Sequence, residues 1–313
     1  RKNNLKVWFR GNWSGWEGWF NYPKITRAEH IKKTKDFIVK HRDIFEDGDI
    51  FSACPECENG GPGDPRRNGD VEGHRRFLID EYNVTKRELK AINKNVASNF
   101  NSMNGDVARV VMDRDTTAAM DGIVAIDHYV EDPEQLSKDI AEISRSSGGK
   151  IVLGEFGAPI PDIHGNLTEK EQALWIREAM SEFIQMPEVA GLNYWTNIGS
   201  STALWNENGE AKKAVSELTS FYKAPIIKIV IKDEAGFRVK EAVLRLNGKK
   251  FNADSKENIY LPYFEDLRDV EVRADGYFSK KTILTDSDEM TIVLHKQSEN
   301  LIYKALEFIK NLF

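Results

Sequence analysis

The sequence predicts an α/β fold in which βα units build a parallel sheet, followed by a second, all-β part. Two observations support this prediction. From residue 1 to about residue 222, short apolar runs alternate with longer stretches of helical period, which is typical of strands and helices alternating along a parallel sheet. After residue 225 the hydrophobic period becomes two, around Asp, Gly and Asn turns, which indicates antiparallel strands.

The first part holds six predicted strands and four predicted helices. The helices are marked by apolar residues at i, i+3 and i+4. This alternation suits either a (β/α)8 barrel or an open doubly wound sheet, and periodicity does not choose between them. A complete barrel takes about 250 residues, so a barrel here would lack its first two units. The strands are expected over 5–10, 49–54, 96–103, 122–129, 150–157 and 189–195, and the helices over 25–41, 71–92, 132–146 and 168–185.

The second part has a different organisation. Residues 225–296 alternate apolar and polar positions between turn residues, which predicts a small antiparallel β-sandwich. The final stretch, "SENLIYKALEFIKNLF", has the pattern of a short amphipathic helix. We therefore expect a first domain over 1–223, a sandwich domain over 224–297 and a terminal helix over 298–313.

Composition limits the classes of partner. The net charge of -6 and the pI near 5.7 provide no basic face for a phosphate backbone, so nucleic acid is not an expected partner. No run approaches the ~18 apolar residues of a membrane-spanning helix. The two cysteines share one tetrapeptide, so they cannot form a disulfide framework. The chain opens without Met, and we expect that a leader has been removed. An extracellular or cell-surface location is favoured. The oligomeric state is not predicted.

Unusual residues gather where the predicted strands end. In parallel βα architectures, ligands bind at the carboxyl ends of the strands, because the loops converge there. Five of the six predicted strand ends carry polar or aromatic residues. They are Arg10, Asn12, Trp13, Trp16 and Trp19 after the first strand, Pro55 and Glu56 after the second, Asp127, His128 and Tyr129 at the fourth, Glu155 at the fifth, and Asn193, Tyr194 and Trp195 at the sixth.

Two of these residues are carboxylates at the ends of hydrophobic strands, Glu56 and Glu155. Such a position disfavours the charged form unless the group has partners or a chemical role. Glycoside hydrolysis uses two carboxyl groups, one to protonate the leaving oxygen and one to attack the anomeric carbon or activate water. Tryptophans offer flat faces for sugar rings. The pattern therefore predicts an enzyme that acts on a carbohydrate.

The segment "KIVLGEFGAP", followed by "AGLNYWTN", resembles the seventh and eighth strands of the clan-A retaining glycoside hydrolases, the cellulase-like (β/α)8 or TIM-barrel enzymes. The resemblance implies that Glu155 is the nucleophile and that Trp195 forms the floor of the catalytic subsite. It matches Glu56, in "SACPECENGG", to the acid/base, and Tyr129 to the tyrosine that orients the nucleophile. It covers roughly residues 5–222.

The sequence departs from this family at two site positions. Pro55 stands where the family has an Asn that contacts the sugar 2-hydroxyl, and Asp127 stands where it has a His. The tail resembles carboxypeptidase-regulatory-like and surface-layer-associated β-sandwich modules, chiefly through "VEVRADGYFSKKTIL". The resemblance implies no metal and no cofactor.

For substrate binding we predict a set of polar and aromatic residues at the strand ends. His128 would point to the opposite face of its strand from Tyr129, where it could instead be a core histidine, and part of the tryptophan cluster could pack under a loop. Glu58, nearer the glycines than Glu56, is expected to be solvated. The predicted substrate-binding residues are Arg10, Asn12, Trp13, Trp16, His128, Asn193 and Trp195.

Two alternatives to a glycosidase stay open. The Cys54-x-x-Cys57 pair could bind zinc or cycle as a dithiol, although zinc normally takes four ligands and no second cysteine pair exists. A local link between the two cysteines is also left open. The other alternative is a non-catalytic carbohydrate-binding or cell-surface protein on a degenerate barrel. The sugar, the linkage and endo or exo action are not predicted.

Overall fold

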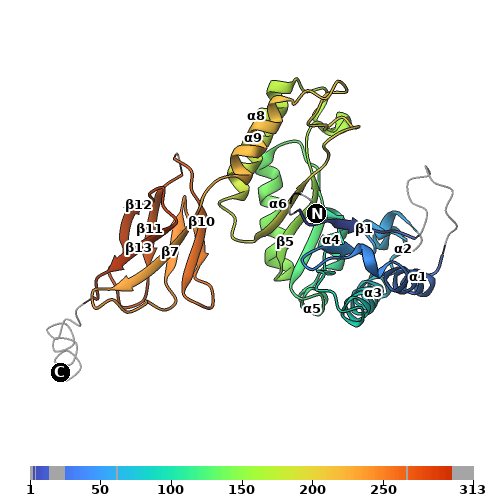
Figure 1. Ribbon diagram of the computed structural model, residues 1–313, viewed down its shortest axis with the longest axis horizontal. Coiled ribbons are helices and arrows are strands. Elements are labelled where there is room, and N and C mark those ends of the chain that lie inside the picture. Colours follow the sequence, from blue (N-terminus) through green and yellow to red (C-terminus); the bar gives the residue numbers. More distant parts are fainter. Residues whose placement is uncertain (1–2, 4, 14–24, 61–62, 266, 298–313) are drawn as a thin grey trace, which may run out of the picture. The chain divides into compact units, whose positions relative to one another are not determined.

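The computed structural model describes residues 3, 5–13, 25–60, 63–265 and 267–297 (Figure 1). The predicted helix over 298–313, as well as Trp16 and Trp19, lies outside the described residues. The chain divides into two compact units, one over 1–183 and 188–217 and one over 184–187 and 218–313. The predicted domain boundary at 223/224 stays a prediction.

The first unit contains parallel strands at five of the six predicted positions. The strand predicted over 96–103 is wrong for most of its length, since β3 (Met103–Asn104) begins only at Met103 and Ala97 makes an isolated bridge. Strand β1 (Trp8–Arg10) pairs in parallel with β2 (Ile50–Ser52). Ile50 of β2 also makes an isolated parallel bridge with Ala97. The other four strands form one sheet in chain order, and every pairing is parallel. The prediction of a parallel α/β arrangement is therefore confirmed. These strands are β3 (Met103–Asn104), β4 (Ile123–Asp127), β5 (Lys150–Phe156) and β6 (Val189–Tyr194).

The strands do not close into a barrel. Among the described residues, β1 and β6 each have a sheet partner on one side only. A (β/α)8 barrel closes when its eighth strand pairs with its first, and six strands leave that pairing unmade. The expected (β/α)8 barrel, of which the sequence shows six units, is therefore not closed in the described part of the chain.

The four predicted helices are α1 (Arg27–Lys40), α3 (Val71–Ala91), α6 (Pro133–Ser147) and α8 (Glu169–Phe183). Their ends follow from local chemistry. Thr26 caps α1 in a reciprocal capping box with Glu29, and Asp132 caps α6 by accepting from the Gln135 amide at 2.7 Å. Helix α6 ends at Gly148, whose left-handed conformation favours glycine.

Several short helices were not predicted. Most span only four to seven residues, too few to display a helical period. Two of them, α4 and α5, lie in the chain between β3 and β4. The set comprises α2 (Pro65–Asn68), α4 (Gly105–Val111), α5 (Arg114–Ala119), α7 (Pro161–His164), α9 (Lys213–Tyr222) and the 3-10 turns η1 (Arg42–Ile44) and η2 (Cys57–Asn59).

The core of the first unit lies between this sheet and its helices. In β5, every residue from Ile151 to Phe156 is buried, including Glu155. Helix α6 contributes Leu136, Ile140 and Ile143, all fully buried. A strand buried on both faces has a continuous apolar sequence, so a carboxylate within it needs polar partners from neighbouring strands.

The described residues of the second unit form seven strands in two sheets, ordered β10-β7-β13 and β12-β11-β8-β9. Buried residues of both sheets belong to one hydrophobic cluster, which includes Ile229, Leu244 and Val272. Strand β13 pairs with β7 in parallel, so the predicted purely antiparallel arrangement is wrong at this pair. The strands are β7 (Ile226–Asp233), β8 (Val243–Leu246), β9 (Lys249–Asn252), β10 (Asn258–Pro262), β11 (Asp269–Arg273), β12 (Lys280–Ile283) and β13 (Glu289–Leu294).

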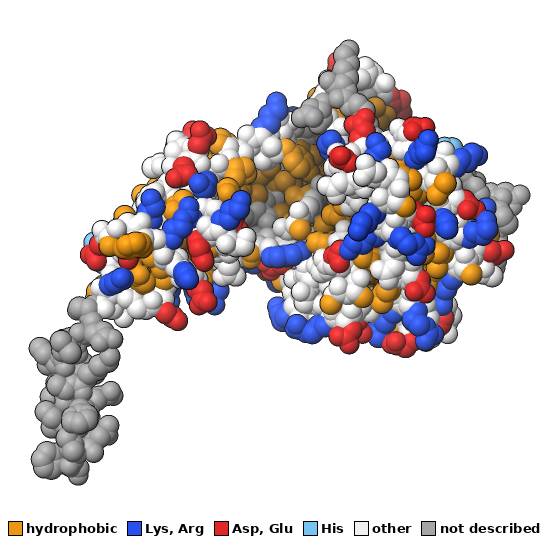
Figure 2. All heavy atoms as spheres, turned by 60° about the horizontal axis from the view of Figure 1, so that its bottom comes forward, with side chains coloured by type: hydrophobic (Ala, Val, Ile, Leu, Met, Phe, Trp, Pro, Cys, Tyr) orange, Lys and Arg blue, Asp and Glu red, His pale blue; other side chains and the backbone are white. Residues whose placement is uncertain are grey.

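Charges of both signs are interspersed over the face shown in Figure 2, with no large basic area on it. This agrees with the acidic balance of the sequence. None of the helices in the described part of the chain has the length and apolar character needed to cross a membrane.

Candidate active site

Three carboxylates meet at the carboxyl ends of the strands. Glu56 follows β2, Asp127 ends β4 and Glu155 lies on β5. One carboxylate oxygen from each of them lies within 4.8 Å of the others. Asp127 and Glu155 are partners in the parallel ladder, so their approach is set by strand register. The structure thus brings together Glu56 and Glu155, which are 99 positions apart in the sequence.

Glu155 is held at both carboxylate oxygens. Arg10, at the end of β1, donates to Oε1, and the Tyr129 hydroxyl donates to Oε2 at 2.8 Å. Burial, followed by the charge of Glu155, raises the pKa of Tyr129, so this hydroxyl keeps its proton and can donate. Burial alone would lower the pKa of Arg10, but the charges of Asp127 and Glu155 outweigh it and raise that pKa. Two donors that keep their protons therefore fix the orientation of the Glu155 carboxylate.

Asp127 is the deepest of the three carboxylates. Its Oδ2 accepts from Arg10 at 2.7 Å and from the Ser102 hydroxyl at 2.8 Å. Its Oδ1 is buried and has no hydrogen-bond partner within the described ranges. Burial raises the pKa of Asp127 well above its usual range, against the opposing charge of Arg10. Gly154 leaves room for this group, because a Cβ there would lie 2.5 Å from Asp127 Oδ1.

Glu56 is positioned by an unusual backbone. Its φ of 49° is left-handed, and its amide donates to the Ser102 carbonyl at 2.7 Å. Its Oε2 accepts from the Asn59 side chain at 3.3 Å. Glu56 is half-buried, whereas Glu155 is only 8% exposed. The two carboxylates thus meet in different environments, one anchored by charged and hydroxyl donors and one nearer to solvent.

The expectation that Glu58 is solvated is wrong. Glu58 is 3% exposed, because the η2 turn carries it back toward α4. Its Oε1 accepts from the Asn104 amide at 2.7 Å, while Oε2 is buried and finds no hydrogen-bond partner in the part of the chain that is described. Burial raises the pKa of Glu58 to about 7.

We expect Glu58→Gln to change how stability depends on pH. Between about pH 4.5 and 7, unfolded Glu58 ionises while folded Glu58 keeps its proton, so the free energy of unfolding of the wild type falls as pH rises. The glutamine side chain of the variant does not titrate, and its carbonyl can still accept from the Asn104 amide. The variant should therefore gain up to about 3 kcal/mol relative to wild type across this window.

Chemical denaturation of both proteins from pH 4 to 8 measures this difference. Glu178→Gln, on an exposed position of α8, controls for the substitution itself. A difference between wild type and Glu58→Gln that stays constant over the whole range would contradict the raised pKa.

Three more predicted residues lie beside the carboxylates. Trp195 follows β6 and is 41% exposed, and the guanidinium carbon of Arg10 lies 6.0 Å from its ring centroid. The Asn193 side chain donates to the Gly154 carbonyl at 2.9 Å, and the Asn12 side chain donates to the Pro55 carbonyl at 3.3 Å. The two amides brace the backbone next to Glu155 and Glu56. Contact of any of these residues with a sugar stays a prediction.

Two predicted substrate-binding residues are not brought to the carboxylates. His128 is buried on the helix side of β4, where its Nε2 lies 2.7 Å from Asp139 on α6. Successive side chains of a strand point to opposite faces, so Tyr129 and Asp127 face the site and His128 does not. Trp13 is half-buried, donates from Nε1 to Thr34 on α1 at 2.7 Å and packs against Phe37 at the edge of the core.

Sequence reasoning missed Ser102 and gave Asp127 no role. Asp127 was named at the end of its strand and as a departure from the resembled family, although its place two residues before Tyr129 puts both on one face. Ser102 carries no signal in the sequence, since a serine before a short strand is common in loops. Only the register of β3 against β4, with Met103 opposite Ile126, brings Ser102 to Asp127.

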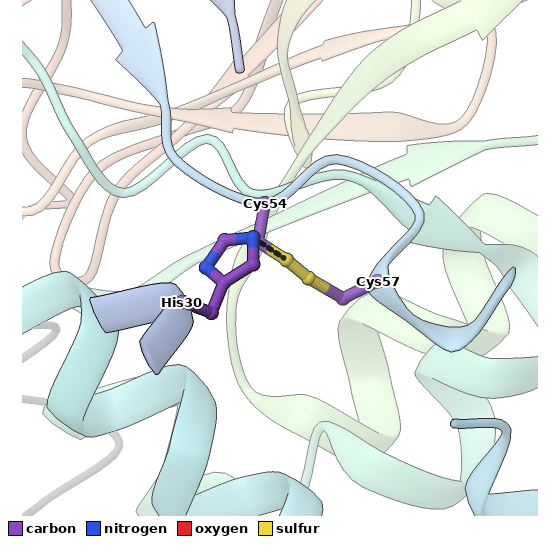
Figure 3. A group of neighbouring side chains, drawn as sticks. All are labelled: His30, Cys54 and Cys57. Carbon is purple, nitrogen blue, oxygen red and sulfur yellow. Dashed lines mark hydrogen bonds between the residues drawn. A yellow bond between two sulfur atoms is a disulfide. The ribbon is translucent and has the colours of Figure 1, made fainter. Parts of the chain in front are cut away.

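Cys54 and Cys57 form a disulfide (Figure 3). His30, from α1, lies against it with Nε2 3.3 Å from the Cys54 sulfur. All three residues are buried, and their potential ligand atoms lie within 4.8 Å of one another. In this structure both sulfurs are engaged with each other, so they are not available as thiolate ligands.

Comparisons with known proteins give similarities of fold only. No family model matches the chain, and no curated protein matches it. Solved structures similar to it include Bacteroides uniformis beta-glucuronidase 2, at 9% identity and TM-score 0.48, covering 93% of this chain and 40% of the other. A fungal beta-1,4-galactanase matches at 16% identity and TM-score 0.48, covering 71% and 79%. An endo-beta-1,3-glucanase from Amycolatopsis mediterranei matches at 14% and 0.44, covering 68% and 89%.

The chain spans well under half the length of the first structures it matches. It covers 40%, 39% and 34% of the beta-glucuronidases from Bacteroides uniformis, Dictyoglomus thermophilum and Bifidobacterium dentium. At these identities the similarity concerns the fold, and the site has to be argued from its own residues.

Proposed function

We propose that this protein is a retaining glycoside hydrolase that cleaves β-glycosidic bonds of a polysaccharide or oligosaccharide. The observation that carries the proposal is the approach of Glu56 and Glu155, whose nearest carboxylate oxygens lie within 4.8 Å. Retaining enzymes separate their two carboxyl groups by about 5–5.5 Å, whereas inverting enzymes need about 6.5–9.5 Å to admit a water molecule. Oxygens this close fit the shorter of the two arrangements, and we therefore propose double displacement.

In the first step, Glu155 attacks the anomeric carbon while Glu56 donates a proton to the leaving oxygen. The glycosidic bond breaks, and a glycosyl ester forms on Glu155. In the second step, Glu56 takes a proton from water, and the resulting hydroxide displaces the ester and restores the carboxylate. Arg10 and Tyr129 suit Glu155 to this role, because both oxygens are held by donors in one orientation.

The different environments of the two carboxylates match their proposed roles. Glu155 must present one oxygen to the anomeric carbon, and its two donors hold the carboxylate in one orientation. Glu56 must exchange protons with a leaving group and with water, which its partial exposure permits. Trp195 offers a partly exposed aromatic face beside Arg10 on which a sugar ring can stack. Pro55 cannot donate to a sugar hydroxyl, but the Asn12 amide lies beside it.

The proposal extends to the architecture. We assign the first unit to six βα units of a (β/α)8 barrel of the clan-A kind and the second to a carboxypeptidase-regulatory-like β-sandwich. The order of β1 to β6 and the placement of the carboxylates at one end support the first assignment. The shared hydrophobic cluster of the two sheets supports the second.

A panel of β-linked polysaccharides and oligosaccharides tests the function. We expect reducing sugar to be released from at least one member, and proton NMR of the fresh product to show the β-anomer before it mutarotates. An α-anomer as first product would exclude the retaining mechanism. If no member of the panel releases reducing sugar, the proposed hydrolysis by Glu56 and Glu155 is wrong.

A second candidate is carbohydrate binding without hydrolysis. It is favoured by Pro55, which stands where the resembled enzymes carry the Asn that contacts the sugar. Under this alternative, the fluorescence of Trp195 would change on addition of a glycan, while no reducing sugar would be released from it. The same panel therefore separates the two candidates.

A further inference from the structure

We propose that the Cys54–Cys57 disulfide is a positioning device for Glu56, and that proton transfer by Glu56 depends on it. The inference rests on the proposed glycosidase function and adds a requirement that this function does not contain. It assigns a role to a motif that the chemistry of Glu56 and Glu155 does not use.

The disulfide encloses Glu56 in a ring of four residues. Cys54, Pro55, Glu56 and Cys57 are consecutive, and the two cysteine Cα atoms lie 5.3 Å apart. Within the ring, Pro55 restricts the backbone through its own φ. Glu56 has a φ of 49°, a conformation that a non-glycine residue rarely adopts without support. The covalent link supplies such support.

One end of the ring is anchored in the core. His30 is fully buried, with Nε2 3.3 Å from the Cys54 sulfur and Nδ1 3.3 Å from Glu81 Oε1. The Trp13 amide donates to the same Nε2 at 3.3 Å. The Oε1 of Glu81, on α3, accepts from the Thr34 hydroxyl. Cys54 therefore packs against a buried histidine of α1 that faces α3.

The other end of the ring begins η2, and this end depends on the disulfide. Hydrogen bonds from the Asn59 amide to the Glu56 carbonyl at 3.0 Å and from the Gly60 amide to the Cys57 carbonyl at 3.2 Å are local. On the amino side of Glu56, the hydrogen bond from its backbone amide to the Ser102 carbonyl fixes the chain. The next contact on the carboxyl side is made by Glu58, whose Oε1 accepts from the Asn104 amide at 2.7 Å. Between the contacts with Ser102 and Asn104, the disulfide is the covalent constraint on the turn, and its loss lets φ of Glu56 leave the left-handed region. A displacement of about 1 Å at a catalytic group can lower the rate about 10²-fold.

Reduction by a phosphine tests this dependence in the whole protein. Tris(2-carboxyethyl)phosphine transfers two electrons to the disulfide, and water supplies the oxygen and protons, so the products are two thiols and the phosphine oxide. The S–S bond breaks and the phosphorus is oxidised. The double variant Cys54→Ser with Cys57→Ser reaches a comparable open state without any reductant.

The decisive readout compares two substrates with the same sugar. A natural oligosaccharide has a poor leaving group that needs the proton from Glu56, whereas a 2,4-dinitrophenyl glycoside leaves without it. We expect kcat/KM on the oligosaccharide to fall about 10- to 100-fold on reduction, mostly in kcat. On the dinitrophenyl glycoside, the rate at which the glycosyl ester forms should change less than about threefold. Reoxidation should restore the wild-type kcat/KM on the oligosaccharide. The reductant should not change kcat/KM of the double variant.

Several results would overturn the inference. An equal loss of activity on both substrates, with a matching loss of the near-UV circular dichroism signal, would show that the disulfide stabilises the fold as a whole. No loss of activity on either substrate would show that catalysis does not depend on the disulfide. Two titratable thiols or stoichiometric zinc in the purified chain would show that the disulfide is not the resting state. If the oxidised chain hydrolyses neither substrate, the proposed function itself is wrong and the inference falls with it.

Discussion

Glu155→Ala is expected to lower kcat by at least about 10⁴-fold on every substrate that the protein cleaves. The change removes the carboxylate that forms the glycosyl ester, and nothing else in the cluster can replace it. Asp127 is buried and its Oδ2 is engaged with Arg10 and Ser102. Sugar affinity should stay nearly unchanged, because Trp195 and the other strand-end residues are intact. Titration of Trp fluorescence and steady-state kinetics measure the two quantities separately.

External azide gives the stereochemical proof of this role. In Glu155→Ala the face from which the nucleophile attacks is open, so azide should displace an activated leaving group with inversion and give the α-glycosyl azide. Glu188→Ala, at the amino end of β6 and away from the carboxyl ends of the strands, is the matched control and should retain wild-type kcat. Full activity of Glu155→Ala, or rescue with retention, would exclude Glu155 as nucleophile.

The strands and the principal site residues could be predicted because both depend on local pattern. Parallel strands buried on two faces have continuous apolar sequences, so β5 was recognisable together with the glutamate that ends it. The rule that ligands bind at the carboxyl ends of strands then placed Glu56, Tyr129 and Glu155 together. The structure brings these three side chains to one place.

The errors arise where side-chain direction depends on tertiary contacts. His128 follows Asp127 directly, and the pleat sends it to α6. Glu58 lies in a glycine-rich stretch, which indicates a solvated loop, but the η2 turn returns it to the core. Trp13 meets Thr34 and Phe37 because α1 packs there. Hydrophobic periodicity does not contain such information, since it describes one element at a time.

Whether the sheet closes into a barrel could not be predicted from the sequence pattern either. Each βα unit predicts a strand and a helix, but whether the first strand pairs with the last depends on strand number and stagger. The disulfide was left open for a similar reason, since the spacing of Cys54 and Cys57 permits a link, a metal or free thiols. The left-handed backbone of Glu56 and the packing of His30 are what the structure adds.

Glu56→Ala should lower kcat/KM on a natural oligosaccharide by about 10²- to 10⁴-fold, which is the usual contribution of a general acid/base. On a 2,4-dinitrophenyl glycoside the glycosyl ester should still form rapidly, because that leaving group needs no proton. The ester should then accumulate, since no base activates water, and a burst of dinitrophenol should precede slow turnover. Stopped-flow absorbance measures the burst, and intact mass spectrometry detects the ester.

Azide distinguishes Glu56 from its neighbour. In Glu56→Ala the anion can enter where the base has been removed and attack the ester on Glu155, and two inversions give the β-glycosyl azide. Glu58→Gln is the comparison, because Glu58 lies two residues after Glu56 and, unlike the half-buried Glu56, is buried. It should retain turnover of the oligosaccharide and give no azide product. If azide instead rescues a Glu58 variant while Glu56→Ala remains active, the acid/base is Glu58, and the left-handed conformation of Glu56 serves to turn the chain toward it.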